Sequence, residues 1–597
     1  MIINLFVGYL YIMNHKLIYL SVFLLISQLS FAQDKTKYKI WNPANDTLNV
    51  LEGQGWPKKV KDYYDRLPAK AEGIVRSDVW NLSKNNAGLN LRFRTNSDEI
   101  IVKYAVKGSL QMPHMPATGV SGVDLYAKDR DGNWLWSAGS FSFGDTITYR
   151  FRNLEQVNNP DREYTLYLPL YNSLKWMEIR VPGEKSFTPL PLHQEKPIVV
   201  YGTSIAQGAC ATRPGLAWTS ILQRKLDQPV INLGFSGNGR LEKELIALLT
   251  EIEAKLYILD CLPNLTGITS DDLMARIETS VLQLQNKRPG VPILLTEHDG
   301  YTDELISPKR KADYNNPNIT LNDAFKQLKA KGIKNIYLLT KNEIGQDIES
   351  MVDGVHPNDV GMMNYANAYQ KIIKEIFNQP QGNVSTAKPI TQYRELPGYD
   401  WEKRHNEVLN YNKTNQPQLV FIGNSITHFW AGQPSAHIAR GASSWDKYFK
   451  AKNPVNMGFG WDRIENALWR VYHGELDGFA AKQIVLMIGT NNLQFNSDAE
   501  IAEGLKTLIT AIKARQPQAK ILVLGILPRR EMESRISKLN LLYAKTALNL
   551  KVQYADAGNL LLNTHKKVNE ELFTDGLHPN AQGYEKLGSF INKQIAN

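Results

Sequence analysis

The sequence predicts an α/β protein with two parallel-sheet domains, each of about five strands, that follow an N-terminal β-sandwich. Three observations lead to this prediction. Residues 197–378 alternate short apolar runs with helix-like stretches, the pattern of a parallel sheet covered by helices. Residues 415–597 repeat this alternation, which predicts a diverged copy of the same domain. Residues 34–185 contain short runs of alternating polar and apolar residues, which is typical of a β-sandwich.

The length and charge of the chain limit its class. A chain of 597 residues is too long for one hydrophobic core, and about 150 residues per domain gives roughly three to four domains. The formal net charge is +10, but lysine and arginine are scattered rather than gathered in arms or stripes. Without a recognisable motif, this pattern argues against a nucleic-acid partner. A general attraction to acidic glycans or envelope surfaces remains open.

The N-terminus predicts export. Lys16 precedes the short apolar run 17–26, and small residues then lead to a predicted cleavage after Ala32, so residues 1–32 are interpreted as a secretory signal peptide. The run is shorter than the ~20 residues of a membrane-spanning helix, and no cysteine follows the cleavage site, which disfavours an anchor helix or a lipoprotein. We expect a periplasmic or extracellular protein with no stable membrane insertion. Met1 and Met13 both remain open as the start.

The individual strands are predicted from short apolar runs. In the β-sandwich they are residues 89–95, 100–106, 146–151, 164–170 and 176–181. In the two parallel-sheet domains they are residues 198–201, 230–233, 256–259, 293–296 and 336–339, and residues 419–422, 455–457, 484–488, 521–525 and 552–554. We place the domains at residues 33–192, 193–380 and 415–597, with a linker and helical lead-in at 381–414.

A serine follows the first strand of each parallel-sheet domain. The strands end in Gly-Thr-Ser204-Ile and Gly-Asn-Ser425-Ile, small-residue turns that deliver a hydroxyl to the mouth of a sheet. A serine hydroxyl is a weak nucleophile until a base removes its proton, and a third group must hold that base in place. A matching histidine and carboxylate are therefore expected in each domain.

An Asp-x-x-His segment stands near the end of each domain. His356 follows Ser204 by 152 residues (356 − 204), and His578 follows Ser425 by 153 residues (578 − 425). Each histidine comes three residues after an aspartate, Asp353 or Asp575, on the loop before the final helix. This loop belongs to the side of an open α/β sheet where ligands bind. The Asp-x-x-His segment occurs at nearly the same distance from the serine in both domains, and this repetition favours a catalytic role over a turn that only caps a helix.

The ordered set of motifs resembles the SGNH (GDSL-type) hydrolase family over residues 195–378 and 415–597. Fixed donors for an oxyanion would complete the site. The resemblance implies two flavodoxin-like three-layer domains, ester hydrolysis through an acyl-serine, and no metal or organic cofactor. It implies nucleophiles Ser204 and Ser425, bases His356 and His578, and orienting carboxylates Asp353 and Asp575. The implied oxyanion donors are the serine N–H groups, Gly237 and Asn264 in the first site, and Trp461 and Asn491 in the second.

A further resemblance concerns the β-sandwich. Its segment Gly-Val-Asp-Leu-Tyr at residues 122–126 resembles the Gly-x-Asp-Leu-Tyr signature of a domain found in front of certain bacterial SGNH-type esterases. The resemblance implies an all-β, jelly-roll-like domain ahead of the first catalytic domain.

Both copies depart from the family pattern. The segment 260–264 reads Asp-Cys-Leu-Pro-Asn where Gly-x-Asn-Asp is usual, which puts the role of Asn264 in doubt. Trp461 stands where glycine is usual. Its indole could form a sugar-stacking platform with Trp430, or the tryptophans could pack between helix and sheet. Both interpretations remain open.

The two cysteines each follow a predicted strand that ends at the first site. Cys210 and Cys261 are therefore expected either to form a disulfide or to be two separate buried thiols.

The predicted function is a secreted bacterial-type serine esterase that removes acetyl groups from an acetylated polysaccharide or oligosaccharide. One alternative is a lipid-directed acylhydrolase or lysophospholipase, because the last domain also resembles platelet-activating-factor acetylhydrolase subunits. Another is a glycan-binding protein in which one hydrolase copy is degenerate. Two complete Ser, Asp and His sets favour an enzyme.

Overall fold

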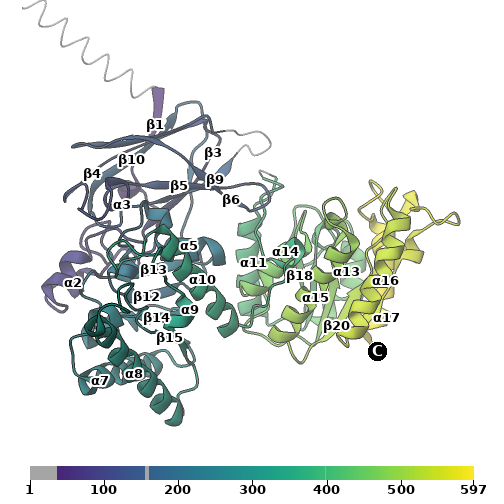
Figure 1. The fold of residues 1–597 in the computed structure, drawn as a ribbon. Coiled ribbons are helices and arrows are strands. Elements are labelled where there is room, and N and C mark those ends of the chain that lie inside the picture. Colours follow the sequence, from purple (N-terminus) through teal and green to yellow (C-terminus); the bar gives the residue numbers. More distant parts are fainter. Residues whose placement is uncertain (1–36, 155–160, 397, 597) are drawn as a thin grey trace, which may run out of the picture.

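The computed structural model describes residues 37–154, 161–396 and 398–596. The predicted signal peptide, residues 1–32, lies outside these ranges. In the described part of the chain, no helix combines the length and the hydropathy needed to cross a membrane. Three structural units follow one another along the chain (Figure 1).

The N-terminal unit is a sandwich of two antiparallel sheets, as predicted. The first sheet has the order β1 (Tyr38–Trp41), β10 (Leu174–Pro182), β4 (Glu99–Val106), β8 (Ile147–Arg152), β7 (Ser140–Ser142). The second has the order β11 (Thr188–Pro189), β3 (Asn90–Thr95), β9 (Arg162–Tyr167), β5 (Asp124–Lys128), β6 (Trp134–Ser137), and β2 (Leu51–Glu52) pairs with β3. The core between the sheets is apolar, with fully buried residues such as Phe93, Val102 and Leu166.

The middle unit contains a five-stranded parallel sheet with the order β13 (Val230–Gly234), β12 (Ile198–Gly202), β14 (Leu256–Asp260), β15 (Ile293–Thr296), β16 (Ile336–Leu339). Numbered along the chain, this is the flavodoxin-like order 2-1-3-4-5. Ile198 and Val200 pack with helices α5 (Trp218–Leu226) and α10 (Asp359–Ile376) on one face. Val199 and Tyr201 pack with α6 (Lys243–Leu249), α7 (Ser270–Lys287) and α8 (Pro308–Ala330) on the other.

The last unit repeats this architecture. Its parallel sheet has the order β18 (Pro454–Gly458), β17 (Leu419–Gly423), β19 (Gln483–Met487), β20 (Lys520–Leu524), β21 (Gln553–Ala555). Leu419 and Phe421 pack with α13 (Ala442–Tyr448) and α17 (Ala581–Ala596). The opposite face is covered by α11 (Trp401–Asn415), α14 (Ile464–Tyr472), α15 (Asp498–Arg515) and α16 (Glu533–Asn549). Apolar burial on both faces explains the continuous apolar runs of these strands.

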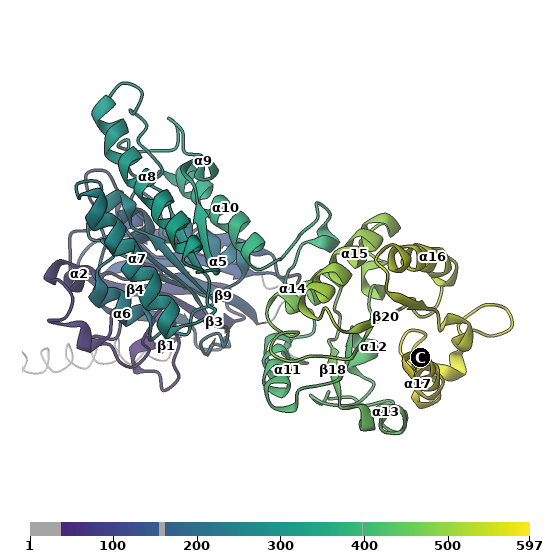
Figure 2. The ribbon, with the colours of Figure 1, turned by 90° about the horizontal axis from the view of Figure 1, so that it is seen from below.

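The sandwich and the middle unit form one larger body, and the last unit extends from its side (Figures 1 and 2). A buried arginine joins the sandwich to the last unit. Arg92 on β3 donates to Glu163 on β9 at 3.0 Å and to Glu402 on α11 at 2.7 Å. Its side chain is 4% exposed, so this charge depends on its carboxylate partners.

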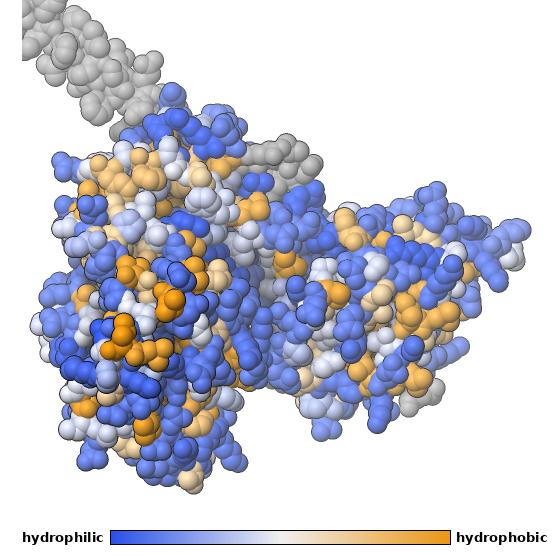
Figure 3. All heavy atoms as spheres, in the orientation of Figure 1, coloured by the Kyte–Doolittle hydropathy of each residue, from blue (hydrophilic) through white to orange (hydrophobic). Residues whose placement is uncertain are grey.

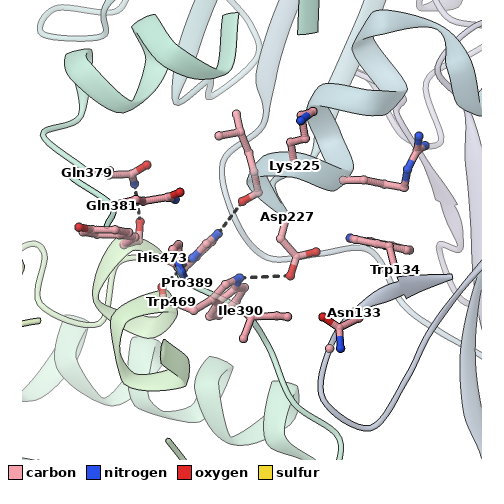
Figure 4. Close-up of a pocket in the computed structure, with 14 residues that line it drawn as sticks. Asn133, Trp134, Lys225, Asp227, Gln379, Gln381, Pro389, Ile390, Trp469 and His473 are labelled. Atoms are coloured by element: carbon pink, nitrogen blue, oxygen red, sulfur yellow. Dashed lines mark hydrogen bonds between the residues drawn. The ribbon is translucent and has the colours of Figure 1, made fainter. Parts of the chain in front are cut away.

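A second junction joins all three units. Lys128 of the sandwich donates to Asp227, which follows α5, at 2.8 Å, and the indole Nε1 of Trp469 on α14 donates to the same carboxylate at 3.1 Å. Beside this junction lies a cavity of about 230 Å³, into which Trp134 of the sandwich and His473 of the last unit also face (Figure 4). Side chains of three units therefore meet in one polar and aromatic interface.

We expect Arg92→Met to lower the stability of the protein, because Glu163 and Glu402 would lose a buried positive partner. Breaking a buried ion pair in this way typically costs about 3–5 kcal/mol. The midpoint of urea unfolding measures the effect. The control is Lys61→Met, which removes an exposed pair with Glu72. Equal midpoints for the two variants would contradict a structural role for Arg92.

Candidate active sites

Each candidate nucleophile lies at the carboxyl end of an inner strand. Ser204 is the first residue of the short helix α4 (Ser204–Gln207), directly after β12. A Cβ at Gly202 would come within 2.6 Å of Ala206 Cβ and 3.0 Å of the Asp260 carbonyl oxygen, so only glycine fits this close turn. Between β12 and β14 the strand order reverses, which is where open α/β sheets bind ligands.

The first site contains a continuous hydrogen-bonded relay. Ser204 Oγ lies 2.9 Å from His356 Nε2, and His356 Nδ1 lies 2.7 Å from Asp353 Oδ2. Asp353 Oδ1 also accepts from the His356 backbone N–H at 2.8 Å. Burial acts to raise the pKa of Asp353, but these hydrogen bonds from His356 outweigh it and lower the pKa below its ordinary value. The carboxylate therefore stays charged and holds the imidazole in one orientation.

The second site repeats the relay. Ser425 begins α12 (Ser425–His428), and its Oγ lies 2.9 Å from His578 Nε2. His578 Nδ1 lies 2.7 Å from Asp575 Oδ2. Burial again acts to raise the pKa of Asp575, and hydrogen bonds from His578 lower it overall. The structure thus brings together both predicted Ser, His and Asp sets with nearly identical distances.

The same cap positions both histidine loops. The Asn358 side chain accepts from two backbone N–H groups at the start of α10, and its Nδ2 donates to the Glu349 carbonyl at 2.7 Å. Asn580 makes the equivalent contacts before α17, with its Nδ2 at 2.7 Å from the Glu571 carbonyl. An asparagine cap satisfies the free N–H groups of the helix and fixes the loop before it. Each histidine is therefore held on a rigid loop.

Gly237 and Trp461 occupy equivalent positions beside the serines. The residues two positions earlier, Phe235 and Phe459, donate to the last carbonyl of β12 and β17 at 3.0 and 3.1 Å. Both loops then enter the left-handed region, with φ of 70° at Gly237 and 60° at Trp461. This conformation costs a non-glycine residue about 1–2 kcal/mol. A Cβ at Gly237 would have no atom within 4 Å, which explains how Trp461, 50% exposed, fits the same place.

The two asparagines lie on short helices at the carboxyl ends of β14 and β19. Asn264 belongs to η4 (Leu262–Asn264), and its Oδ1 accepts from the Gly239 N–H at 3.0 Å, so its NH₂ group remains the donor for a substrate. Asn491 belongs to η7 (Thr490–Asn492), and its Nδ2 donates to the Asp462 carbonyl at 3.0 Å, which uses one of its two hydrogens. Both placements suit a role as oxyanion donor.

The surroundings of the two histidines differ. In the first site, the imidazole of His114 lies 6.0 Å from that of His356, between ring centroids. His114 sits at the tip of a tight turn of the sandwich, closed by two backbone hydrogen bonds between Met112 and Met115. Sequence reasoning missed His114, because nothing in its local pattern connects it to a site on another unit.

In the second site, the ring of Phe429 lies 5.5 Å from that of His578, between ring centroids, and two arginines lie nearby. Arg440 donates to Thr574, the neighbour of Asp575, at 2.9 Å, and Arg529 donates to the Thr490 carbonyl at 3.3 Å. Burial lowers the pKa of His578, Asp575 raises it, and the two arginines lower it, so that it lies below 6.5 overall. Sequence reasoning also missed these arginines, although Arg529 follows the end of a predicted strand, which is a usable signal.

Trp430 is not a substrate-binding residue, contrary to one of the two interpretations of the sequence. It is fully buried and packs against Phe421, Trp445 and Phe449, and its Nε1 donates to Ser444 Oγ at 2.9 Å. A side chain without solvent exposure offers no face to a sugar ring. Trp461 is the exposed tryptophan of the predicted pair, and its role in substrate binding stays a prediction.

The disulfide interpretation is also wrong. Cys210 and Cys261 are both free and buried. Cys261 packs in the core cluster that contains Tyr201, whose carbonyl oxygen is 3.6 Å from its sulfur, whereas Ala211, next to Cys210, packs on the opposite face of the sheet. The two thiols follow strand ends at one site, but no bond joins them.

The fold and the two relays define a serine hydrolase with a flavodoxin-like sheet. Residues 195–374 and 421–586 each match the model of the GDSL-like lipase/acylhydrolase family. Residues 38–187 match the GxDLY domain, the N-terminus of SGNH-hydrolase-type esterases. The chain belongs to the GDSL-like lipase/acylhydrolase family and is a carboxylic ester hydrolase, as predicted.

Individual relatives agree with this assignment. The chain is 30% identical over 221 residues to platelet-activating factor acetylhydrolase IB subunit alpha2 of Homo sapiens, a match that covers 36% of this chain and 92% of the relative. It is 31% identical to a GDSL-like lipase of known structure from Bacteroides ovatus, with a TM-score of 0.52 over 57% of this chain and 98% of that chain. Another solved structure that was matched is a family two carbohydrate esterase from Clostridium thermocellum in complex with cellohexaose, which is 13% identical, with a TM-score of 0.34 over 49% of this chain and 93% of that chain.

We expect the acid limb of kcat/KM at the Ser425 site to lie below pH 6.5. A base must be unprotonated to act, and a lowered pKa keeps His578 neutral at lower pH. The pH profile of a Ser204→Ala variant on an uncharged acetyl ester measures this limb. Arg440→Gln should move the limb upward, because one of the charges that lower the pKa is lost. A limb at or above 6.5, unmoved by Arg440→Gln, would contradict the expected electrostatics.

We expect Asn264→Ala, in a Ser425→Ala background, to reduce kcat by about 10²- to 10³-fold, the usual cost of one oxyanion donor. The rate with a small acetyl ester measures the loss. Asn335→Ala is the matched control, because Asn335 precedes β16 at the amino end of the same sheet. If both variants keep the parent rate, Asn264 is not the donor, despite its orientation by Gly239.

Proposed function

We propose that the protein is an exported esterase that removes acetyl groups from an acetylated polysaccharide or oligosaccharide at two active sites. Ser204 and Ser425 are the nucleophiles, His356 and His578 the bases, and Asp353 and Asp575 hold the bases in place. The proposal that both sites work rests on one observation, the distance of 2.9 Å between serine Oγ and histidine Nε2 in each site. They also disfavour a glycan-binding protein with one degenerate copy.

The geometry supports a two-step acyl transfer. The histidine Nε2 takes the proton of the serine Oγ as this oxygen attacks the ester carbonyl carbon. The negative charge on the carbonyl oxygen is stabilised by the serine N–H, by the N–H of Gly237 or Trp461, and by the Asn264 or Asn491 amide. The ester bond then breaks, and the sugar oxygen leaves with the proton from the histidine. Water, deprotonated by the same histidine, cleaves the acyl-serine and releases acetate.

Sugar esters are favoured by the groups that surround the sites. His114, Arg440 and Arg529 are polar donors, and Trp461 presents a half-exposed aromatic ring. Hydroxyl-rich sugars are bound by such donors and by stacking on aromatic faces, whereas a long acyl chain needs a continuous apolar groove.

A lipid-directed acylhydrolase is the second candidate, and one observation favours it. Aliphatic side chains are exposed on the two loops beside His356, among them Leu305, Ile306 and Ile348. Thr302 of the first loop donates from its backbone to the Gly354 carbonyl at 3.3 Å, which holds the loops together. Figure 3 shows hydrophobic side chains gathered on the larger body at the level of the middle sheet. Apolar patches of this kind mark interaction sites for lipids or partners.

We expect each single variant, Ser204→Ala and Ser425→Ala, to keep part of the turnover of 4-nitrophenyl acetate, because the other relay is intact. The double variant should lose at least about 10³-fold. Initial rates of equally folded proteins, checked by circular dichroism, measure the effect. Two independent sites would be the wrong picture if one single variant already abolished all turnover.

The same single variants distinguish the two candidate substrates. Acetate release from acetylated xylan and pectin is compared with hydrolysis of phospholipids and of 4-nitrophenyl esters with increasing chain length. Preference for acetylated glycans and for the shortest acyl chain would support the proposal. Preference for long chains or phospholipids at both sites would replace it with the lipid-directed alternative.

A further inference from the structure

We propose that the Ser425 site is specific for an ester whose alcohol part carries a negative charge, and that Arg440 and Arg529 bind this charge. The ligand we infer is an acetylated acidic glycan, with the carboxylate of a uronic acid beside the acetylated hydroxyl. The proposal rests on the proposed deacetylation of glycans and assigns a substrate class to one of its two sites.

Arg440 borders the histidine side of the site. Its guanidinium lies 5.4 Å from the centroid of the Phe429 ring, and this ring is 5.5 Å from the His578 ring. Its Nη1 donates to Thr574 Oγ1 at 2.9 Å, and Thr574 in turn bonds to the His578 carbonyl through its backbone and side chain. The cation is thus fixed beside the base, where the leaving sugar must lie.

Arg529 borders the oxyanion side of the site. It follows β20, and its Nη1 donates to the carbonyl of Thr490, the residue before Asn491, at 3.3 Å. The side chain is partly buried, and this burial lowers the pKa of its guanidinium. The two arginines are therefore held by different loops of the site, and the charges of both act on His578.

Neither arginine forms an ion pair within the described residues. Their hydrogen bonds go to a hydroxyl and to a carbonyl, both uncharged. Nearby arginines of the same unit are neutralised, such as Arg530 by Glu570 at 2.7 Å and Arg535 by Asp498 at 2.8 Å. Two partly buried cations without a carboxylate partner leave a charge that an anionic ligand can satisfy.

The first site is charged differently: Tyr301 stands where Arg529 stands, and the nearby cation Arg310 is already paired with Asp303 at 2.7 Å. The backbone N–H of Arg530 donates to the Gly576 carbonyl, and the backbone N–H of Thr302 donates to the Gly354 carbonyl in the same way. The residues that precede these two donors, Arg529 and Tyr301, therefore occupy equivalent positions in the two sites. Beside the base, the first site has the imidazole of His114 from the sandwich, whereas the second site has the ring of Phe429 from its own unit. The two relays are therefore alike, whereas the charge around them differs.

A glycan carboxylate suits this site better than a phospholipid. Three aliphatic residues exposed beside the first site, Ile348, Val352 and Val360, are replaced in the second by polar residues. Counted from the capping asparagines Asn358 and Asn580, the replacements are Glu570, Thr574 and Gln582. The half-exposed indole of Trp461 remains as an apolar surface, and a flat ring is suited to a sugar.

The test uses the full chain with Ser204→Ala, so that only the Ser425 site acts, at pH 8, where His578 is neutral. The matched substrates are acetylated galacturonic acid and acetylated polygalacturonate, each compared with its methyl ester, which removes the charge. We expect kcat/KM to be about tenfold higher for the charged forms and to fall with added salt. Two variants, Arg440→Gln and Arg529→Tyr, should each remove most of this preference, mainly by raising KM for the charged substrates. Tyrosine is chosen at position 529 because Tyr301 is the equivalent residue of the first site.

The control is Arg530→Gln, whose charge is already neutralised by Glu570, and its preference should stay within twofold of the parent. Equal rates on charged and methylated forms, or a preference unchanged in both arginine variants, would overturn the proposal. Faster cleavage of an acetylated phospholipid than of the acidic glycan would assign the arginines to a phosphate instead and overturn it as well. Failure of the proposed function is recognised separately, as absence of acetate release from every glycan while 4-nitrophenyl acetate is still cleaved.

Discussion

The hydrogen bond between a serine hydroxyl and an imidazole nitrogen, formed twice at 2.9 Å, is the interaction on which the rest of the structure depends. Each partner comes from an opposite end of its unit, the serine from the first strand and the histidine from the loop before the last helix. The parallel sheet, with the order 2-1-3-4-5, gathers these ends at one edge. Burial of both sheet faces then makes that edge rigid, which keeps the relay prepared for reaction.

The two parallel-sheet units share the relay and differ in its surroundings. The same asparagine cap, the same Asp-x-x-His turn and the same left-handed loop residue occur in both copies. The second copy tolerates Trp461 where the first has Gly237, because the side chain projects into open space. What differs is the source of the flanking groups, which is another unit in the first copy and the same unit in the second. This difference is the basis of the proposal that the two sites act on different esters.

The sandwich contributes to this difference through its position. Its Met112–Met115 turn is held against the middle unit, since Met115 packs with Ala211 in a shared core and Thr118 donates to the Thr212 carbonyl at 2.7 Å. The same unit holds the last one through Arg92 and Lys128. A module that only tethered the enzyme to a polymer would not need to place a side chain beside His356.

The sequence by itself determined the three-part fold and the two relays, because these depend on local patterns: apolar periodicity, small-residue turns, and an Asp-x-x-His turn whose own backbone holds the histidine. Only the tertiary structure decided that Trp430 is buried, that the two cysteines are unbonded and which residues flank the two relays. Trp430 is buried because α17 covers it, and Cys210 and Cys261 are two free buried thiols, of which only Cys261 belongs to the core on its face of the sheet. His114, Arg440 and Arg529 reach the sites through packing between distant segments. Such contacts are not predicted by the apolar periodicity of the sequence.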